Sequence, residues 1–156
     1  MNPLLRLFLF TALLALSGPL LHAQRELLTP DQIEYVNKTW PHTKKTSTGM
    51  RYLVEKEGAG EHPKPGDEVS VLYVGKLLSG EKFDEQLDPA HALVFRVARG
   101  AVIEGWDQII QDMRKGEKRT VIIPSSLAYG SRGQAPRIPR DAVLVFEMEL
   151  IDIKPE

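Results

Sequence analysis

Cysteine is absent from this chain of 156 residues. An oxidising compartment therefore imposes no disulfide framework on it, and a lipid-modified N-terminal cysteine is excluded. A large charge of one sign is also lacking, because 20 basic residues nearly balance 21 acidic ones and leave a net charge of −1. This balance gives no reason to expect binding to nucleic acid or to an anionic membrane surface.

The usual catalytic signatures are missing too. The histidines are dispersed and show no metal-ligand spacing; they are His22, His42, His62 and His91. No Gly-x-Ser-x-Gly elbow surrounds Ser125 and Ser126, and no Gly-Lys-Ser/Thr loop could cradle a phosphate. We therefore expect no metal and no cofactor, and a chemistry that requires no bond cleavage.

Long apolar runs occur only at the start of the chain. Arg6 is followed by an almost unbroken apolar run over residues 7–16, and the small residue Ala23 comes shortly after it. This order is typical of a secretory signal peptide over residues 1–23, with Gln24 as the new N-terminus. The alternative is a membrane anchor, but the run is shorter than the roughly 20 apolar residues that span a bilayer. The pattern favours export to a bacterial periplasm without stable membrane insertion; secretion beyond the cell is the alternative.

Residues 24–46 form an extension in which Thr29-Pro30-Asp31-Gln32 predicts a helix start. Thr29 can cap the helix, Pro30 suits its first position, and Gln32 completes a capping box. Trp40-Pro41 should end it, because the residue before a proline avoids the α region. A helix this short is expected to pack onto its own domain, so we expect a monomer rather than a dimer. The polar residues 43–49 read as a linker.

Residues 47–156 predict one α+β domain. Apolar residues at helical spacing from Ile103 to Met113 predict one helix, with Arg114 and Lys115 in its last turn and Gly116 as its left-handed stop. Strand patterns are expected over residues 50–55, 69–74, 93–97, 119–123 and 143–151. The result is a twisted antiparallel sheet of about five strands around one short helix, with an apolar concavity between them.

Several motifs occur in a fixed order along this domain. They are Gly66-Asp67, Tyr73-Val74-Gly75, Gly80-Glu81-Lys82-Phe83-Asp84, Val102-Ile103-Glu104-Gly105-Trp106, Ala128-Tyr129-Gly130, Ile138-Pro139 and Leu144-Val145-Phe146-Glu147-Met148-Glu149-Leu150. In this order they resemble the FK506-binding-protein (FKBP) family of peptidyl-prolyl cis–trans isomerases. The resemblance covers about residues 48–154 and implies the FKBP-like fold.

The resemblance also implies a pocket. Its catalytic residues would be Asp84, which faces the twisting amide, Tyr129, whose hydroxyl donates to a substrate carbonyl, and Phe83. Trp106 would form the floor, and the backbone N–H of Ile103 would be a further donor. The substrate-binding residues are Tyr73, Leu93, Val102, Ile103, Trp106 and Phe146.

This chain departs from the family pattern at two positions of the predicted pocket. Pro89 stands where an arginine often pairs with the positions of Tyr73 and Asp84. Leu93 stands where an aromatic wall residue is common. Asp84 therefore needs another partner, and the pocket should be wider on the side of Leu93.

The resemblance predicts an exported isomerase that assists the folding of proline-containing polypeptides and binds macrolides of the FK506 and rapamycin type. The alternatives are a chaperone-like or partner-binding module with little isomerase activity, and a receptor for a small ligand. Taken one by one, Phe83, Trp106 and Phe146 would be ordinary core residues, and Asp84 a solvated turn acid. Arg132, Arg137 and Arg140 read as a solvated loop.

Overall fold

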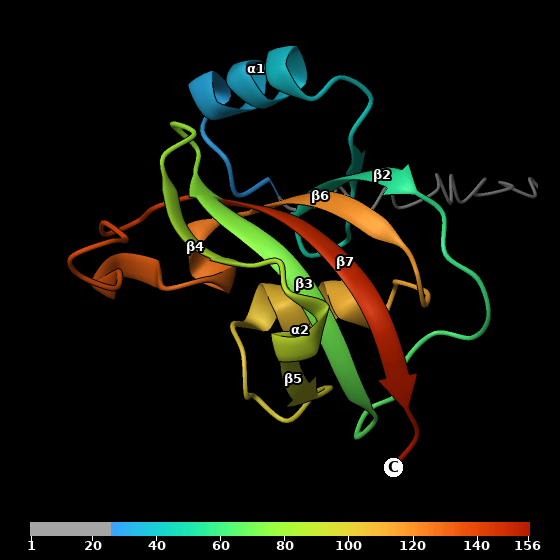
Figure 1. Ribbon diagram of the computed structural model, residues 1–156. Coiled ribbons are helices and arrows are strands. Elements are labelled where there is room, and N and C mark those ends of the chain that lie inside the picture. Colours follow the sequence, from blue (N-terminus) through green and yellow to red (C-terminus); the bar gives the residue numbers. More distant parts are fainter. Residues whose placement is uncertain (1–25) are drawn as a thin grey trace, which may run out of the picture.

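The structure, a computed structural model, describes residues 26–156; the predicted signal peptide lies outside the described residues. One antiparallel sheet forms the body of the described chain, with helix α2 against one face and helix α1 against the other (Figure 1). The predicted α+β class with an antiparallel sheet around a short helix is confirmed. No helix of residues 26–156 is both long and apolar enough to cross a bilayer.

The sheet has seven strands in the order β1-β2-β6-β7-β3-β4, with β5 paired to β3 as well. Their bounds are β1 Lys44–Lys45, β2 Arg51–Lys56, β3 Glu68–Leu77, β4 Lys82–Gln86, β5 Leu93–Arg96, β6 Lys118–Ile123 and β7 Leu144–Lys154. The helices are α1 Pro30–Thr39 and α2 Glu104–Ile110, with short 3-10 turns at Pro89–His91, Ser125–Leu127 and Gly130–Arg132. Strand β3 pairs with β4, β5 and β7, which makes it the hub of the half of the sheet that carries the cavity.

Helix α1 begins with the predicted capping box. The N–H of Gln32 donates to Oγ1 of Thr29 at 3.3 Å, and the N–H of Thr29 donates to Oε1 of Gln32 at 2.9 Å. The helix then packs onto the back of β6 and β7, where it covers a second apolar cluster. The buried members of this cluster are Leu28, Val36, Ile122, Val143 and Val145. The extension therefore docks on its own domain, as the sequence predicted.

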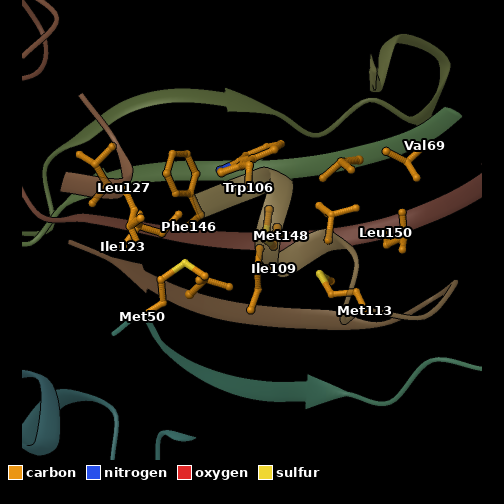
Figure 2. Packing of buried hydrophobic residues seen from close by; sticks show 14 of the residues in the cluster. Met50, Val69, Trp106, Ile109, Met113, Ile123, Leu127, Phe146, Met148 and Leu150 are labelled. Atoms are coloured by element: carbon orange, nitrogen blue, oxygen red, sulfur yellow. The ribbon is translucent and has the colours of Figure 1, made fainter. Parts of the chain in front are cut away.

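The main core lies between α2 and the inner face of the sheet (Figure 2). Strand β7 alternates as predicted, and its inward residues Leu144, Phe146, Met148 and Leu150 are all buried. Helix α2 adds Trp106, Ile109 and Ile110 from its apolar face. This packing fixes the position of α2, and the N-terminal turn of α2 then borders the cavity.

The prediction that the helix continues through Arg114 and Lys115 was wrong, because α2 ends at Ile110. After it the chain tightens into a 3-10-like turn, in which the Met113 N–H donates to the carbonyl of Ile110 at 3.1 Å. The next N–H, that of Arg114, donates to Oε2 of Glu117 at 2.9 Å instead of to a helix carbonyl. Arg114 and Lys115 therefore lie beyond the last turn, whereas Gly116 has the predicted left-handed conformation, with φ of 80°.

The predicted linker is more ordered than its polar residues suggested. Strand β1 pairs with β2, with Lys44 opposite Tyr52 and Lys45 opposite Arg51. Backbone groups make these bonds whatever the side chains are, so polarity alone does not exclude a strand. Two residues of the predicted linker, Lys44 and Lys45, therefore form the strand at one edge of the sheet.

Candidate active site

A cavity of about 430 Å³ opens above α2, between the inner face of the sheet and the loop that follows β6. All nine residues that the sequence analysis assigned to a pocket lie on its lining: Tyr73, Phe83, Asp84, Leu93, Val102, Ile103, Trp106, Tyr129 and Phe146. They come from strands β3, β4, β5 and β7, from the start of α2 and from the 125–140 loop. The structure thus brings the residues together, and their roles in binding and catalysis stay predictions.

Trp106 forms the bottom of the cavity, with 3% of its surface exposed. The rings of Tyr73 and Phe146 meet the indole edge to face, at centroid distances of 5.0 and 5.2 Å and interplanar angles of 85°. The indole N–H has no acceptor among the described residues, and its nitrogen lies on the side that faces the Phe146 ring (Figure 2). The floor is therefore rigid and apolar.

One wall depends on the glycine in β3. Gly75 pairs with Phe146 of β7 on one side and with Asp84 of β4 on the other. The ring of Phe83 stacks edge to face on Phe146 at 5.7 Å, directly over this glycine. A Cβ on Gly75 would lie 2.7 Å from the Phe83 ring and 2.9 Å from the Phe146 ring. The two rings can pack this closely only because position 75 has no side chain.

Asp84 is the acid of the cavity, and a tyrosine holds it. The Tyr73 hydroxyl donates to Oδ2 of Asp84 at 2.7 Å, and the N–H of Glu85 donates to Oδ1 at 3.0 Å. Pro89, at the position where the family often has an arginine, starts a 3-10 turn and offers no cation. Burial raises the pKa of Tyr73, and the hydrogen bond to Asp84 raises it further. The Tyr73 hydroxyl therefore stays protonated at neutral pH, and its hydrogen bond orients the Asp84 carboxylate.

Tyr129 stands at the rim with a free donor. Its hydroxyl makes no hydrogen bond to any residue of the part described, and burial and the charge of Asp84 raise its pKa. The N–H of Gly133 donates to the Tyr129 carbonyl at 3.1 Å and ties its backbone to the loop. The hydroxyl therefore stays protonated at neutral pH and can donate to a carbonyl group in the cavity.

The start of α2 supplies the third donor. Ile103 caps the helix, and its carbonyl accepts from the N–H of Trp106 at 2.9 Å. No residue of the described chain accepts the N–H of Ile103. The loop before it is fixed by Asp107, whose carboxylate accepts from the N–H groups of Ala98 and Gly100, both at 3.0 Å. Asp107 thus positions the segment that brings Val102 and Ile103 to the cavity.

The lining also includes residues that the sequence analysis did not assign to the pocket: Ala101, Gln134, Ala135, Pro136 and Arg137. Gln134 and Ile138 exchange backbone hydrogen bonds of 2.8 and 2.9 Å, which close the loop tip into a small hairpin. The buried side chain of Ile138 anchors this hairpin in the core. Glycines and prolines in the sequence indicated a loop here, but no local signal showed that its tip returns to the cavity.

The part of the chain that the structure describes contains no candidate metal site. No group of three or more acidic or histidine side chains there lies close enough together to hold an ion. The cavity thus offers an aromatic floor and walls, one oriented carboxylate, and two free hydrogen-bond donors, the Tyr129 hydroxyl and the Ile103 N–H. The aromatic part of such a site can hold an uncharged group, and its free donors can bond to carbonyl oxygens.

Fold and cavity together define a small antiparallel-sheet protein with an aromatic pocket over one short helix. The family described as FKBP-type peptidyl-prolyl cis-trans isomerase matches residues 59–151. The chain belongs to this family.

Relatives of known name agree with this assignment. FK506-binding protein 2B of Rhizopus delemar is 52% identical over 91 residues, which are 58% of this chain and 44% of that protein. The FKBP-type peptidyl-prolyl cis-trans isomerase FkpA of Escherichia coli is 43% identical over 112 residues, which are 72% of this chain and 40% of FkpA. The matched region thus spans less than half the length of these two relatives.

Solved structures show the same fold. The crystal structure of E. coli FkpA superposes with a TM-score of 0.71 at 40% identity, over 80% of this chain and 58% of that one. A peptidyl-prolyl cis-trans isomerase from Pseudomonas syringae pv. tomato superposes with a TM-score of 0.70 at 32% identity. That superposition covers 80% of this chain and 92% of the Pseudomonas chain.

Proposed function

We propose that this protein is a peptidyl-prolyl cis–trans isomerase that speeds the rotation of X–Pro bonds in exported polypeptides and so assists their folding. The observation that carries the proposal is the oriented Asp84 carboxylate at the wall of a cavity whose floor is Trp106. Membership of the FKBP-type family supports it.

The reaction asks for little more than such a cavity. Amide resonance opposes rotation with a barrier of about 18–20 kcal/mol, so the uncatalysed step takes tens to hundreds of seconds. Conjugation is lost in the twisted state, and the carbonyl is then less polar than in the planar amide. An apolar cavity therefore disfavours the planar state more than the twisted one. About 4 kcal/mol of such differential binding gives a thousandfold acceleration.

The polar groups would orient the substrate. Trp106 would carry the proline ring, and Phe83 and Phe146 would close over its sides. The hydroxyl of Tyr129 and the N–H of Ile103 would donate to substrate carbonyls. Asp84, held by Tyr73, would face the dipole of the rotating amide. No bond to the substrate forms or breaks, so the reaction requires neither a nucleophile nor a proton acceptor.

The proposed setting is the bacterial periplasm, with an extracellular setting as the alternative. The leader-like residues 1–23 support export, and we propose that residues 24–46 form an extension and residues 47–156 the isomerase domain. Substrates are proline-containing polypeptides, and macrolides of the FK506 and rapamycin type would compete for the same cavity. The docking of α1 on its own domain supports a monomer.

The test uses the protein after export and removal of its leader. The relaxation of an X–Pro peptide from cis to trans is measured with the wild type, with Asp84→Asn and with the matched control Glu85→Gln. Glu85 is the adjacent exposed carboxylate and pairs with Lys82, so the control loses the same charge without loss of the oriented acid. We expect acceleration by the wild type and the control, and at least a tenfold loss in Asp84→Asn.

One result would contradict the proposal, and another would separate catalysis from a holding function. If the folded wild type does not accelerate relaxation, the cavity is a binding surface and not an enzyme site. If Asp84→Asn suppresses the aggregation of an unfolded protein as well as the wild type does, but has lost its isomerase activity, the holding activity is independent of catalysis. Competition by FK506 provides a further check that catalysis occurs in this cavity.

A further inference from the structure

Arg137 brings a positive charge to the mouth of the cavity. Among the lining residues, all within the described chain, it is the one cation. Its Nη1 donates to the carbonyl of Phe83 at 3.3 Å, so the guanidinium bridges from the 125–140 loop to β4. No ion pair joins it to Asp84 in the part described; that carboxylate accepts from the Tyr73 hydroxyl and the Glu85 N–H. Most of the N–H donors of Arg137 are therefore left for a ligand.

The same loop carries two more arginines without acidic partners. Residues 125–141 hold Arg132, Arg137 and Arg140 against one carboxylate, Asp141. Within residues 26–156 none of the three forms an ion pair or appears with any further unprinted partner. Elsewhere in the described chain an ion pair is the common state of arginine, as in Arg51, Arg96, Arg99 and Arg119.

Nearby acids do not neutralise this charge. Glu85 pairs with Lys82 at 2.6 Å, and Asp88 pairs with His91 at 2.7 Å. Of these arginines and acids only Arg137 and Asp84 line the cavity, so Arg137 is the unpaired cation at one part of the lining and Asp84, held by Tyr73, is the acid at another.

Arg137 is held in place for such a contact. It directly precedes Ile138, whose buried side chain and paired backbone fix the loop tip. A guanidinium on a fixed backbone loses less freedom when it binds a carboxylate, and its planar fork matches both carboxylate oxygens. This geometry suits the recognition of an acidic side chain.

We propose that Arg137, aided by the charges of Arg132 and Arg140, selects polypeptides that carry a glutamate or aspartate next to the proline. This inference rests on the proposed isomerase function, since it specifies the substrate class of the same cavity. The acidic side chain contacts Arg137 while the proline ring sits on Trp106. Long-range attraction by the three arginines adds to the rate of encounter.

The test compares short peptides with Glu, Gln or Lys placed in turn before and after the proline. We expect kcat/KM for the Glu peptide to exceed that for the Lys peptide about three- to tenfold at one of the two positions, as expected of an exposed ion pair. In Arg137→Ala the ratio of kcat/KM for the Glu peptide to that for the Lys peptide should fall to about 1. In Arg137→Lys the ratio should be largely kept. At about 1 M NaCl, where the Debye length is about 3 Å, the preference should also weaken in the wild type.

Lys56→Ala is the matched control, because Lys56 is an exposed cation on β2, away from β4 in the strand order. It should keep the full preference. Equal kcat/KM for Glu and Lys peptides in the wild type, or an unchanged ratio in Arg137→Ala, would overturn the inference. Calorimetric titration of the same peptides separates the two proposals. If no peptide is isomerised but Glu peptides bind more tightly through Arg137, the isomerase proposal fails and the recognition of acids stands.

Discussion

Tyr73 and Asp84 lie on neighbouring strands and are joined by a 2.7 Å hydrogen bond from the phenol to the carboxylate. Strand β3 carries the tyrosine and β4 the acid, and the backbone pairing of Gly75 with Asp84 sets their spacing. Pro89 supplies no cation at the position where the family often has an arginine, so the phenol is the side-chain donor to Asp84 among the described residues. The acid is thus oriented by a neutral donor, and its negative charge is not offset by a cation.

Tyr73→Phe should reduce catalysis more than stability. The change leaves the ring contact with Trp106 and removes the donor to Asp84. Because a hydrogen bond to a charged group contributes about 1.5–3 kcal/mol when well shielded, and this pair is half exposed, we expect kcat/KM to fall about three- to tenfold. Urea unfolding should change by about 1 kcal/mol or less. An undiminished rate in the folded variant would show that the carboxylate needs no orientation.

Gly75→Ala should narrow the cavity. The added methyl group would press on the rings of Phe83 and Phe146, which must shift to make room. We expect a loss of peptide affinity and of kcat/KM of about tenfold, with a destabilisation of about 1–3 kcal/mol from overpacking. The peptide assay and thermal unfolding measure the two effects.

Gly105→Ala is the control for overpacking alone. Its methyl group would press on Ile123 and Met50 in the core and not on the ring pair of Phe83 and Phe146. It should cost a similar free energy of unfolding but retain more of the activity. Equal activity losses in the two variants at equal stability would argue against a specific role of the ring pair.

Arg119→Met should destabilise the fold strongly. Arg119 and Glu117 form a buried ion pair, and Arg119 also donates to Oδ2 of Asp112 at 2.9 Å and stacks over Tyr52 at 4.6 Å. Loss of one member leaves the other charge buried and unpaired, which costs about 3–5 kcal/mol. Chemical unfolding of Arg119→Met should show this cost. Glu117→Gln in the same chain should restore part of the stability, and failure to do so would show that the pair is not the cause.

The N-terminal contact should respond to acid. Glu26 forms ion pairs with Lys45 at 2.9 Å and with Arg51 at 3.1 Å. Burial by itself would raise the pKa of the Glu26 carboxyl, but hydrogen bonds from Lys45 and from the Leu28 N–H outweigh it and hold the pKa below its ordinary value. A depressed pKa in the folded state means that the ionised carboxylate stabilises the fold.

The lowered pKa of Glu26 sets the direction in which stability changes with pH. This stabilisation is complete above the unfolded-state pKa of about 4.3 and disappears as the pH falls through the lower folded-state value. The carboxylate is about a third exposed, so we expect Glu26→Gln to cost about 0.5 kcal/mol at pH 7. The difference from the wild type, measured by urea unfolding, should shrink as the pH falls below about 4. A difference that stays constant from pH 7 to pH 3 would show that the charge of Glu26 is irrelevant.

Features that depend on local sequence could be predicted. The cap at Thr29 and the alternation of β7 depend on neighbouring residues, so a short stretch of sequence contains the whole signal. The nine lining residues came from the order of the family motifs, since no single motif shows that Tyr73, Trp106 and Phe146 meet. Taken alone, Trp106 is a core residue, and the structure shows it as both core and floor.

Features that depend on distant partners could not be predicted. Helix α2 ends early because the Glu117 carboxylate takes the Arg114 N–H, which the apolar spacing of residues 103–113 does not reveal. The loop tip with Arg137 reaches the cavity because Ile138 is buried in a core built by other segments. The sequence predicted Arg137 to be a solvated loop residue. Only its position in the fold shows that it lines the cavity.

The second apolar cluster also affects the order in which the chain can fold. Val36 of α1 comes early in the chain, whereas Val143 and Val145, which it covers together with Ile122, come near its end. A chain that is synthesised or exported from its N-terminus therefore carries α1 without its docking surface until β7 has emerged. Such distant contacts form late and slowly, so final closure of the fold waits for almost the complete chain. A protein proposed to assist the folding of other exported chains would itself pass through a prolonged unfinished state.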